Sequence, residues 1–324
     1  MFKIGNIEVK GNVILAPMAG ISFHSYRHFM SDFDIDLCVT EMVSDMGLIY
    51  GNKETLTYID FPKEKVPTGV QLFGHDVESL KKALLLVEKY NPNVAFYDVK
   101  MGCPVPKVVD TGAGSALMKN PKLCGDIIRG LKSVTDKPVT AKIRLGWDKN
   151  SINFLEVIKE LEDAGVDMIA IHARTRKELY TGEPHWDLLK DLRSQMKVPL
   201  VVSGNIFTVE DAVKAMEVTG ADAVMVARGA VGNPLLATNI NRYFRGEEPL
   251  ETSLEEQVKY CKELARLIVE EKGELVGMRV FRSIGPQFFS GYKNVKKLKN
   301  RICLEIETYQ DLENILDEYL KEIC

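Results

Sequence analysis

One cysteine of this sequence stands in a short segment of turn-forming residues. Cys103 lies between Gly102 and Pro104, after an apolar run at residues 94–99 that is typical of a buried strand. A reactive thiol on such a stiff loop is suited to proton donation or, once ionised, to nucleophilic attack. Residues 111–115, Thr-Gly-Ala-Gly-Ser, are small enough to let a backbone or a ligand approach closely. The alternative is a small packed cysteine in a tight turn, because cysteine is often buried.

Polar and reactive side chains also follow the other apolar runs of the first 230 residues. They are Glu41, Gln71, Lys100, Lys142, Arg144, His172, Arg174, Arg176, Ser203, Asn205 and Arg228. Each has an ordinary explanation when taken alone, such as a rim salt bridge for Lys142 or a satisfied buried histidine for His172. The succession of Lys, Cys, Arg and His at consecutive positions of this kind instead indicates one functional rim.

Eight short apolar runs must position these side chains. Most are rich in Val and Ile and do not alternate with polar residues, which is typical of parallel strands buried on both faces. They span residues 13–16, 37–40, 68–73, 94–99, 138–143, 168–172, 199–202 and 223–227. Amphipathic helical segments separate them, most clearly at 76–90, 121–134, 153–164 and 208–219. A small hairpin is expected at residues 2–9.

Eight strand–helix units over about 235 residues predict an α/β fold of the (β/α)8 TIM-barrel type. An open, doubly wound sheet is the alternative, and it would need Gly-x-Gly-x-x-Gly after the first strand. The sequence has Ala16-Pro17-Met18-Ala19-Gly20 there instead. Since the C-terminal ends of barrel strands form the reactive face, Cys103, Lys142 and His172 are expected around one mouth.

The pattern changes after residue 246, where helical periodicity continues without strands at 254–272, 277–289, 295–303 and 309–323. We therefore predict a catalytic barrel over residues 1–246 and a smaller helical domain over residues 247–324. Residues 277–301 contain no Asp or Glu but carry Arg279, Arg282, Lys293, Lys296, Lys297, Lys299 and Arg301. In a chain of net charge −4, this basic block predicts a nucleic-acid surface, with a solvated helix face as the alternative.

The bulk composition limits the classes of protein. A hydrophobic content of 45% and a charged content of 27% are ordinary for a soluble globular protein. We see no signal peptide, and no run approaches the roughly 18 apolar residues of a membrane span. The six cysteines, Cys38, Cys103, Cys124, Cys261, Cys303 and Cys324, form no C-x-x-C pair and suggest neither a zinc site nor a disulfide framework. We expect a cytoplasmic protein with no metal and no membrane contact.

The loops after the last two apolar runs predict a phosphate site. Ser203-Gly204-Asn205 precedes Thr208, a helix N-cap that has Asp211 three residues later. Ala227-Arg228-Gly229 precedes a further helix. TIM barrels often bind a phosphate between these two loops, although Gly-rich turns alone would also explain them. A cofactor ring would then lie across the barrel mouth, where Lys142 could stabilise an anionic reduced flavin.

Five motifs make this sequence resemble the tRNA-dihydrouridine synthases, most nearly their bacterial B-type branch. The motifs are Ala16-Pro17-Met18-Ala19-Gly20, Met101-Gly102-Cys103-Pro104, Gly114-Ser115-Ala116-Leu117, Lys142-Ile143-Arg144-Leu145-Gly146-Trp147 and His172-Ala173-Arg174-Thr175-Arg176. The resemblance covers the whole barrel and is weaker in the C-terminal part. It implies an FMN enzyme that uses NADPH or NADH to reduce the C5–C6 bond of specific uridines in tRNA to 5,6-dihydrouridine.

The resemblance also implies roles for individual residues. Cys103 would be the general acid that gives a proton to C5 after hydride has passed from the flavin to C6. FMN would contact Pro17, Met18, Ala19, Gln71, Lys142, His172, Ser203, Gly204, Asn205, Ala227 and Arg228. Contacts with tRNA are expected at Lys100, Arg144, Arg174, Arg176, Arg279 and Arg282 and, from the basic block, at Lys293, Lys296 and Lys297.

The sequence departs from the family pattern in three places. Lys100 stands where the family usually has Asn, Ser203-Gly204-Asn205 replaces Asn-Gly-Asp, and Ser283-Ile284 replaces Lys-His. Two other functions stay open at this point. One is a flavin-dependent barrel reductase of a free pyrimidine or small enone, which needs no basic helical domain. The other is a non-catalytic RNA-binding protein, which would not bind a yellow cofactor.

Overall fold

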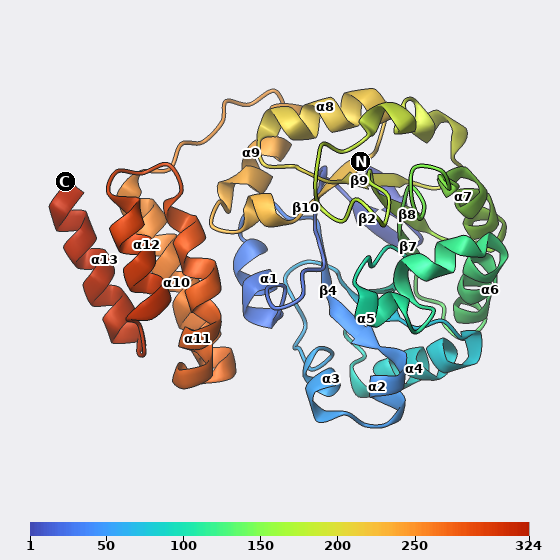
Figure 1. Cartoon of the computed structure of the whole chain (residues 1–324), viewed down its shortest axis with the longest axis horizontal. Helices are drawn as coiled ribbons and strands as arrows, with labels where there is room; N and C mark the ends of the chain where they lie inside the picture. The colour runs from blue at the N-terminus through green and yellow to red at the C-terminus, as the bar shows by residue number, and fades with distance from the viewer. Residues whose placement is uncertain (324) are drawn as a thin grey trace.

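A closed barrel of eight parallel strands forms the larger part of the computed structural model, which describes residues 1–323 (Figure 1). The strands are β3 (Val13–Leu15), β4 (Leu37–Ser44), β5 (Thr68–Phe73), β6 (Phe96–Lys100), β7 (Val139–Arg144), β8 (Met168–His172), β9 (Leu200–Ser203) and β10 (Ala223–Val226). Each strand pairs in parallel with the next along the chain, and β10 closes the barrel by pairing with β3. The predicted TIM barrel is confirmed, and the open doubly wound sheet is excluded.

The barrel is filled by its own side chains. Ile14, Phe96, Ala170 and Val201 belong to one buried cluster inside it, and the opposite faces of the same strands pack under the outer helices. Space inside is tight: a Cβ on Gly69 would lie 2.3 Å from the ring of Phe96. The interior is therefore a packed core, and a ligand has to bind at one end of it.

The predicted hairpin closes one end of the barrel. Strands β1 (Phe2–Ile4) and β2 (Ile7–Val9) pair antiparallel, and Ile4 and Val9 join the interior cluster. Gly5 in the hairpin turn lies against Pro138, which directly precedes β7. The hairpin thus covers the N-terminal ends of the strands, so the cavity described below opens at their C-terminal ends.

Helices surround the barrel, but the unit after β8 differs from the expected strand–helix repeat. The longer helices are α1 (His24–Met30), α4 (Val77–Tyr90), α6 (Pro121–Lys132), α7 (Phe154–Asp163), α8 (Val209–Thr219) and α9 (Leu235–Phe244). The shorter ones are α2 (Asp45–Ile49), α3 (Lys53–Thr57) and α5 (Pro106–Val109), with 3₁₀ turns η1 (Gly114–Lys119) and η4 (Arg228–Ala230). Between β8 and β9 lie only the 3₁₀ helices η2 (Trp186–Leu189) and η3 (Leu192–Gln195). Gly182 and Pro184 interrupt that segment, which leaves a long loop beside the mouth.

Local capping explains where several helices begin and end. Thr208 and Asp211 form the predicted capping box at the start of α8, and Gly220 ends that helix with a φ of 71°. The helix predicted at residues 277–289 is instead α11 (Glu274–Ile284) followed by the 3₁₀ turn η5 (Gly285–Phe289). Pro286 accounts for the change, because it has no N–H for a helical hydrogen bond.

The C-terminal part contains helices and no strand within the described residues. Helices α10 (Leu254–Lys272), α12 (Val295–Leu304) and α13 (Tyr309–Ile323) pack with α11 around Leu264, Phe281, Ile302 and Leu316. A long connection from α9 leads to this bundle (Figure 1). The change to helices alone falls where the sequence placed it, and a separate domain over residues 247–324 stays a prediction. No helix among residues 1–323 has both the length and the apolarity to cross a membrane.

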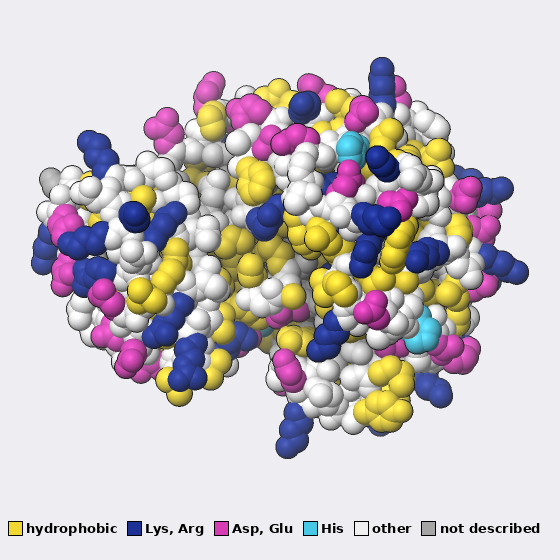
Figure 2. All heavy atoms as spheres, viewed as in Figure 1, with side chains coloured by type: hydrophobic (Ala, Val, Ile, Leu, Met, Phe, Trp, Pro, Cys, Tyr) yellow, Lys and Arg dark blue, Asp and Glu magenta, His cyan; other side chains and the backbone are white. Residues whose placement is uncertain are grey.

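The helical bundle is fixed to the barrel through α1 and the end of α10. The backbone N–H of Ser25 donates to Glu271 at 2.6 Å, and the ammonium of Lys272 lies 4.4 Å from the ring centre of Phe23. Aromatic contacts continue this interface, with the ring centres of Phe33 and Tyr260 5.1 Å apart. Figure 2 shows a hollow lined with hydrophobic side chains beside the bundle.

Candidate active site at the mouth of the barrel

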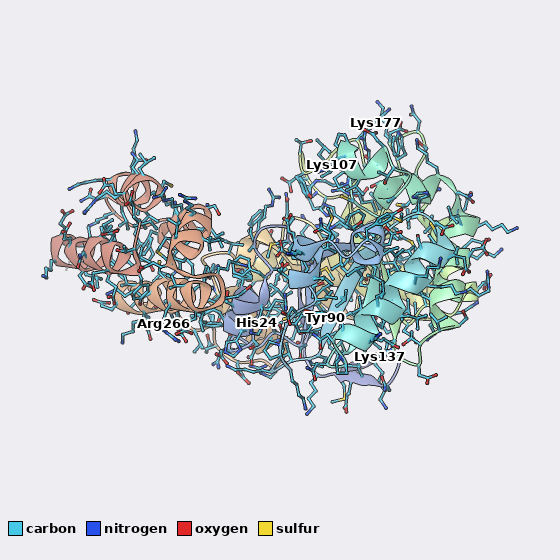
Figure 3. All side chains as sticks on the ribbon, turned by 90° about the horizontal axis from the view of Figure 1, so that it is seen from below. His24, Tyr90, Lys107, Lys137, Lys177 and Arg266 are labelled. Carbon is cyan, nitrogen blue, oxygen red and sulfur yellow. The ribbon has the colours of Figure 1, made fainter. Side chains whose placement is uncertain are left out.

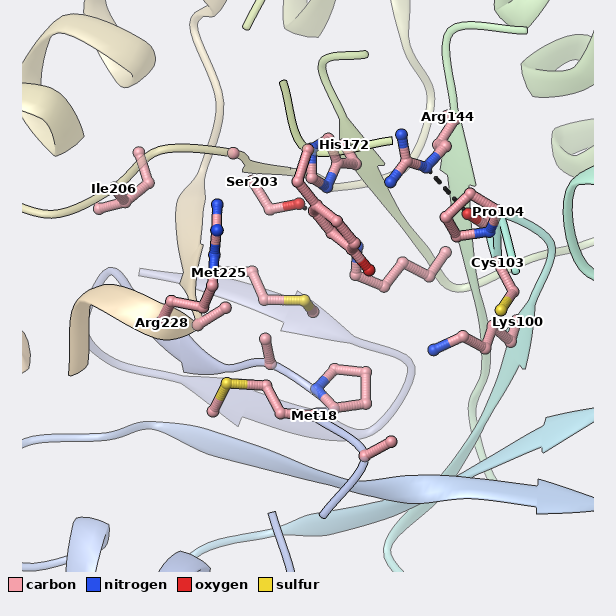
Figure 4. A pocket seen from close by; sticks show the side chains of 18 of the residues that line it. Met18, Lys100, Cys103, Pro104, Arg144, His172, Ser203, Ile206, Met225 and Arg228 are labelled. Atoms are coloured by element: carbon pink, nitrogen blue, oxygen red, sulfur yellow. Dashed lines mark hydrogen bonds between the residues drawn. The ribbon is translucent and has the colours of Figure 1, made fainter. Parts of the chain in front are cut away.

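A cavity of about 330 Å³ opens at the C-terminal ends of the strands (Figure 4). Among its lining residues are Pro17, Met18, Ala19, Lys100, Cys103, Lys142, Arg144, His172, Ser203, Gly204, Asn205, Ala227 and Arg228. Every residue predicted to contact FMN lines this cavity except Gln71. The volume lies in the range of small-molecule sites, and side chains from six different strand ends converge on it.

The loop after β6 holds Cys103 in a fixed place. The backbone carbonyl of Cys103 accepts hydrogen bonds from the backbone N–H of Ser115 at 3.0 Å and from its hydroxyl at 2.8 Å. The preceding carbonyl, that of Gly102, accepts from Nε of Arg144 at 3.0 Å (Figure 4). The Cys103 side chain is only 3% exposed, yet it lines the cavity. The thiol is therefore packed, as one interpretation expected, and it also lines the cavity, while its reactivity stays a prediction.

Three cationic side chains gather beside Cys103 on two neighbouring strands. Lys100 and Lys142 are paired in the β6–β7 ladder, and Arg144 follows two residues later on β7. Burial, together with the charges of Lys100 and Arg144, lowers the pKa of Lys142 to about 7. Burial also lowers the pKa of Lys100, and it lowers the pKa of Arg144 to about 10. The lowered pKa values mean that it costs free energy to keep these neighbouring groups charged. An anionic ligand bound among them would offset that cost.

A buried carboxylate lies behind the lysines. Asp98 accepts hydrogen bonds from Nε2 of Gln71 at 2.6 Å and from the hydroxyl of Thr140 at 2.7 Å. Burial raises the pKa of Asp98, and these hydrogen bonds together with Lys142 and Lys100 oppose the rise. Throughout residues 1–323, no group of three or more His, Cys, Asp or Glu side chains is arranged to hold a metal ion.

Gln71 is not among the residues that line the cavity, and its predicted contact with FMN stays a prediction. Its side chain is fully buried, and its Oε1 accepts a hydrogen bond from Nζ of Lys100 at 3.0 Å while its Nε2 donates to Asp98. The amide is therefore used between two protein side chains. Strand alternation alone could not reveal this, because Gln71 and Lys100 both lie near strand ends.

His172 and Arg174 form a pair on one side of the mouth. Nη1 of Arg174 lies 3.2 Å from Nε2 of His172, which must accept and is therefore unprotonated there. Burial, followed by the charge of Lys142, keeps the pKa of His172 well below its ordinary value. Arg174 is fully buried and also donates to the carbonyls of Thr181 and Gly182. The donors of Arg174 thus hold the loop after β8, and its predicted contact with tRNA stays a prediction.

The loops after β9 and β10 present donors that no protein group uses. Within the described chain, the backbone N–H groups of Gly204, Asn205, Arg228 and Gly229 have no acceptor. The exposed guanidinium of Arg228 likewise has no carboxylate partner in residues 1–323. Such a set of N–H groups beside a free arginine fits a phosphate, as the sequence predicted for these loops.

Tyr180 is a cavity residue that the sequence analysis missed. Its ring centre lies 5.4 Å from Cζ of Arg144 and also 5.4 Å from Cζ of Arg228. Its edge meets the ring of His172, with ring centres 6.0 Å apart. The only signal was a lone aromatic residue in the long loop after β8, and that loop was expected to be a helical unit.

The remaining predicted tRNA contacts lie away from the cavity. Arg176 stacks on Trp147 at the rim, with Cζ 4.7 Å from the ring centre. In the helical part, Arg282 donates to the carbonyl of Ile306 at 3.0 and 2.6 Å, and Lys297 lies 3.4 Å from Glu322. The exposed residues without an acidic partner in the described chain are Arg279, Lys293 and Lys296. Acidic residues of α13 thus neutralise part of the basic block, which the local sequence did not indicate.

Comparisons with known proteins show the family to which this chain belongs. A family model described as dihydrouridine synthase matches residues 14–323. A probable tRNA-dihydrouridine synthase of Rickettsia conorii is 33% identical over 321 residues, covering 98% of this chain and 96% of that protein. The tRNA-dihydrouridine synthase B of Pseudomonas putida is 34% identical over 282 residues, covering 86% of this chain and 83% of that protein. A variant of NCR from Zymomonas mobilis shares the fold, with a TM-score of 0.51, 15% identity and coverage of 79% and 93%.

Proposed function

Since this chain belongs to the dihydrouridine synthase family, we propose that it reduces the C5–C6 bond of uridines in tRNA, with FMN as cofactor and NADPH or NADH as electron source. The observation that carries the proposal is the position of Cys103 on the same cavity as Lys142 and Arg228. The proposed acid, the proposed cation for a flavin ring and the proposed phosphate-binding arginine thus line one cavity. We keep the expectation of a cytoplasmic enzyme.

The cavity residues fit a flavin mononucleotide. The free N–H groups after β9 and β10, with Arg228, would hold the phosphate. Pro17 and Met18 form an apolar wall, and Lys142 would stand beside the polar edge of the ring. When bound and reduced by NADPH or NADH, the flavin supplies the hydride that reaches C6 of the uracil. The protein then has to bind the base and supply a proton.

Cys103 is the proposed source of that proton. Addition of hydride at C6 leaves an electron pair shared between C5 and the C4 carbonyl, and C5 takes the proton from the thiol. This chemistry needs the thiol form, whereas neighbouring cations favour a thiolate. Arg144 uses its Nε on the carbonyl of Gly102 and its Nη1 on the carbonyl of Thr175, so part of its donor capacity is already bound to the backbone.

Gly114 is expected to be essential for the position of Cys103. Its φ is +60°, and a Cβ there would lie 2.8 Å from Cβ of Cys103. The substitution Gly114→Ala should therefore displace the thiol and lower uridine reduction by about 100-fold, as misplaced reacting groups do. Gly51→Ala is the matched control, since Gly51 has a φ of +65° but no atom within 4 Å. Equal activity losses in the two variants would mean that backbone strain alone matters, which contradicts the prediction.

The target uridine lies in folded RNA and has to leave its stack to enter the cavity. The rest of the tRNA then needs positive charge outside it. Arg176 at the rim and Arg279, Lys293 and Lys296 on the helical bundle are predicted contacts that are at least partly exposed and have no acidic partner within residues 1–323. Lys107 and Lys177 add charge at the same end of the barrel, whereas Lys137 lies at the opposite end (Figure 3).

Charge reversal on the bundle should weaken tRNA binding. In Lys293→Glu/Lys296→Glu, we expect a lower affinity and a salt dependence whose logarithmic slope falls by about 1 for each phosphate that the variant no longer binds. Lys297→Glu should have a smaller effect, because Lys297 already lies 3.4 Å from Glu322. Filter binding at several salt concentrations measures both quantities, with Lys137→Glu as the control. An unchanged slope in the double variant would place the RNA elsewhere.

The decisive experiment starts with the purified protein. Its visible absorption spectrum should show a bound flavin, and incubation with NADPH and unmodified tRNA should yield dihydrouridine, measured by nucleoside analysis. A colourless protein that still binds tRNA would favour a non-catalytic RNA-binding protein. Equal activity on free uridine and on tRNA would favour a reductase of small molecules. Mapping the lost modification in a deletion strain would identify the tRNA positions.

A further inference from the structure

A buried line of hydrogen bonds runs from the barrel interior to the cavity. Thr140 and Gln71 donate to the two carboxylate oxygens of Asp98, and the amide oxygen of Gln71 accepts from Nζ of Lys100. Asp98 and Gln71 are 2% and 0% exposed. Because Nε2 of Gln71 faces a carboxylate, its oxygen is turned toward Lys100 and its orientation is fixed. The chain of hydrogen bonds therefore ends at the ammonium of Lys100, which Gln71 holds in position from the side of the barrel interior.

The ammonium of Lys100 keeps free donor capacity toward the cavity. A lysine ammonium has three N–H donors, and only Gln71 accepts from Lys100 in the described chain. The side chain extends into the cavity from the same loop side as Cys103 (Figure 4). No carboxylate of residues 1–323 lines the cavity, and Asp98 lies behind Gln71. Within the described chain, no carboxylate at the cavity surface thus neutralises the charge of Lys100, although burial lowers the pKa of its ammonium.

We propose that Lys100 stabilises the negative charge that develops on the C4 carbonyl oxygen of the uracil, and that Gln71 and Asp98 position it for this task. The inference rests on the function proposed above and names the residue that stabilises the charge formed in that reaction. Hydride addition at C6 moves the C5=C6 electron pair toward C4, so the C4 carbonyl oxygen becomes an oxyanion. The carbonyl re-forms as C5 takes the proton of Cys103, and the thiolate then takes a proton from water. Lys100 keeps its protons throughout.

The position of Lys100 in the chain supports this role. It is the last residue of β6 and lies three residues before Cys103, so the proposed oxyanion partner and the proposed proton donor come from the same strand end. A full positive charge binds an oxyanion more strongly than an amide does, because charge-assisted hydrogen bonds are roughly twice as strong as neutral ones. A donor that acts mainly on developing charge raises the rate of the chemical step more than substrate binding.

Separate half-reactions test the proposal in the flavin-loaded protein. In Lys100→Met, we expect reoxidation of the reduced flavin by tRNA to slow by about 100-fold, the effect of losing one preorganised donor. Flavin content, the rate of flavin reduction by NADPH and the tRNA dissociation constant should stay within about threefold of wild type, since none of them forms the oxyanion. Lys100→Asn should fall between the two. Lys137→Met is the control, because Lys137 lies at the opposite end of the barrel and outside the cavity lining.

A double-mutant cycle tests the positioning of Lys100. Gln71→Met should slow reoxidation by tRNA in the wild-type background and have little further effect in Lys100→Met, because it acts only through Lys100. If the Gln71→Met variant unfolds, Asp98→Asn can take its place in the same double-mutant cycle with Lys100→Met. Additive effects in both cycles would refute the positioning role.

Three outcomes separate this inference from the proposed function. Wild-type reoxidation by tRNA in the Lys100→Met variant would refute the charge-stabilising role and leave the proposed function intact. Loss of bound flavin in that variant would also refute it, because Lys100 would then hold the cofactor. A wild-type protein whose reduced flavin is not reoxidised by tRNA would refute the proposed function itself.

Discussion

Replacement of Cys103 by alanine is expected to lower uridine reduction in tRNA by about 10²- to 10⁴-fold, the usual contribution of a positioned general acid. The flavin should remain bound, because the cavity residues that fit it do not depend on this side chain. Single-turnover reoxidation of the reduced enzyme by tRNA measures the loss directly. Reduction of the flavin by NADPH should be nearly unchanged, since that half-reaction needs no proton from the thiol.

Cys303→Ala provides the control for the thiol itself. Cys303 is exposed on α12 and does not line the cavity, so its loss should leave both half-reactions intact. Cys103→Ser is also informative, because a hydroxyl is a much weaker acid than a thiol and should not restore the rate. Full activity of Cys103→Ala would exclude the role of proton donor and return Cys103 to the interpretation of a packed cysteine.

Flavin binding is expected to weaken as the pH rises from 7 to 9, and Lys142 should cause most of this change. Burial and the charges of Lys100 and Arg144 lower the pKa of Lys142 to about 7 in the ligand-free chain, so above that pH the amine is mostly neutral. A flavin edge that accepts a hydrogen bond from the ammonium favours the protonated form. Binding above pH 7 therefore takes up a proton, and affinity falls by up to tenfold per pH unit.

The variant Lys142→Met should bind flavin about 10- to 100-fold more weakly at pH 7, as expected for loss of a charged hydrogen bond. Its affinity should also be much less dependent on pH between 7 and 9, which fluorescence titration of FMN would measure. His172, whose pKa lies well below its ordinary value, and Arg144, with a pKa of about 10, contribute little slope there. Lys177→Met, at an exposed lysine paired with Asp148, should keep the wild-type profile. Equal slopes in wild type and Lys142→Met would contradict the assignment.

The sequence allowed the barrel and most of the cavity wall to be predicted, for a geometric reason. Parallel strands that close into a barrel bring all their C-terminal ends to one mouth, so strand assignment alone places Lys142, His172 and Ser203 together. The eight apolar runs were clear enough for that assignment. The same reason places the loops after β9 and β10 at this mouth, whereas their role as a phosphate site stays a prediction.

The directions of individual side chains were not accessible in this way. Gln71 and Arg174 were both expected to contact a ligand, and the structure also shows protein groups that take their polar atoms, which the sequence did not indicate. Strand alternation fixes the face on which a residue lies, but it does not say which partner takes its polar atoms. Tyr180 was missed because its loop has no periodic pattern, and the neutralisation of Lys297 depends on Glu322 from another helix. Such long-range pairings carry no local signal.

The hairpin at the start of the chain limits how the enzyme can exchange its substrates. Ile4 and Val9 cover one end of the barrel, so substrates that react with the flavin have to enter and leave through the other end. A nicotinamide and an extruded base would then need the same face of the isoalloxazine. The two reactants would therefore bind one after the other through the same opening of the barrel. Between these two binding events of each catalytic cycle, the protein would hold the electrons.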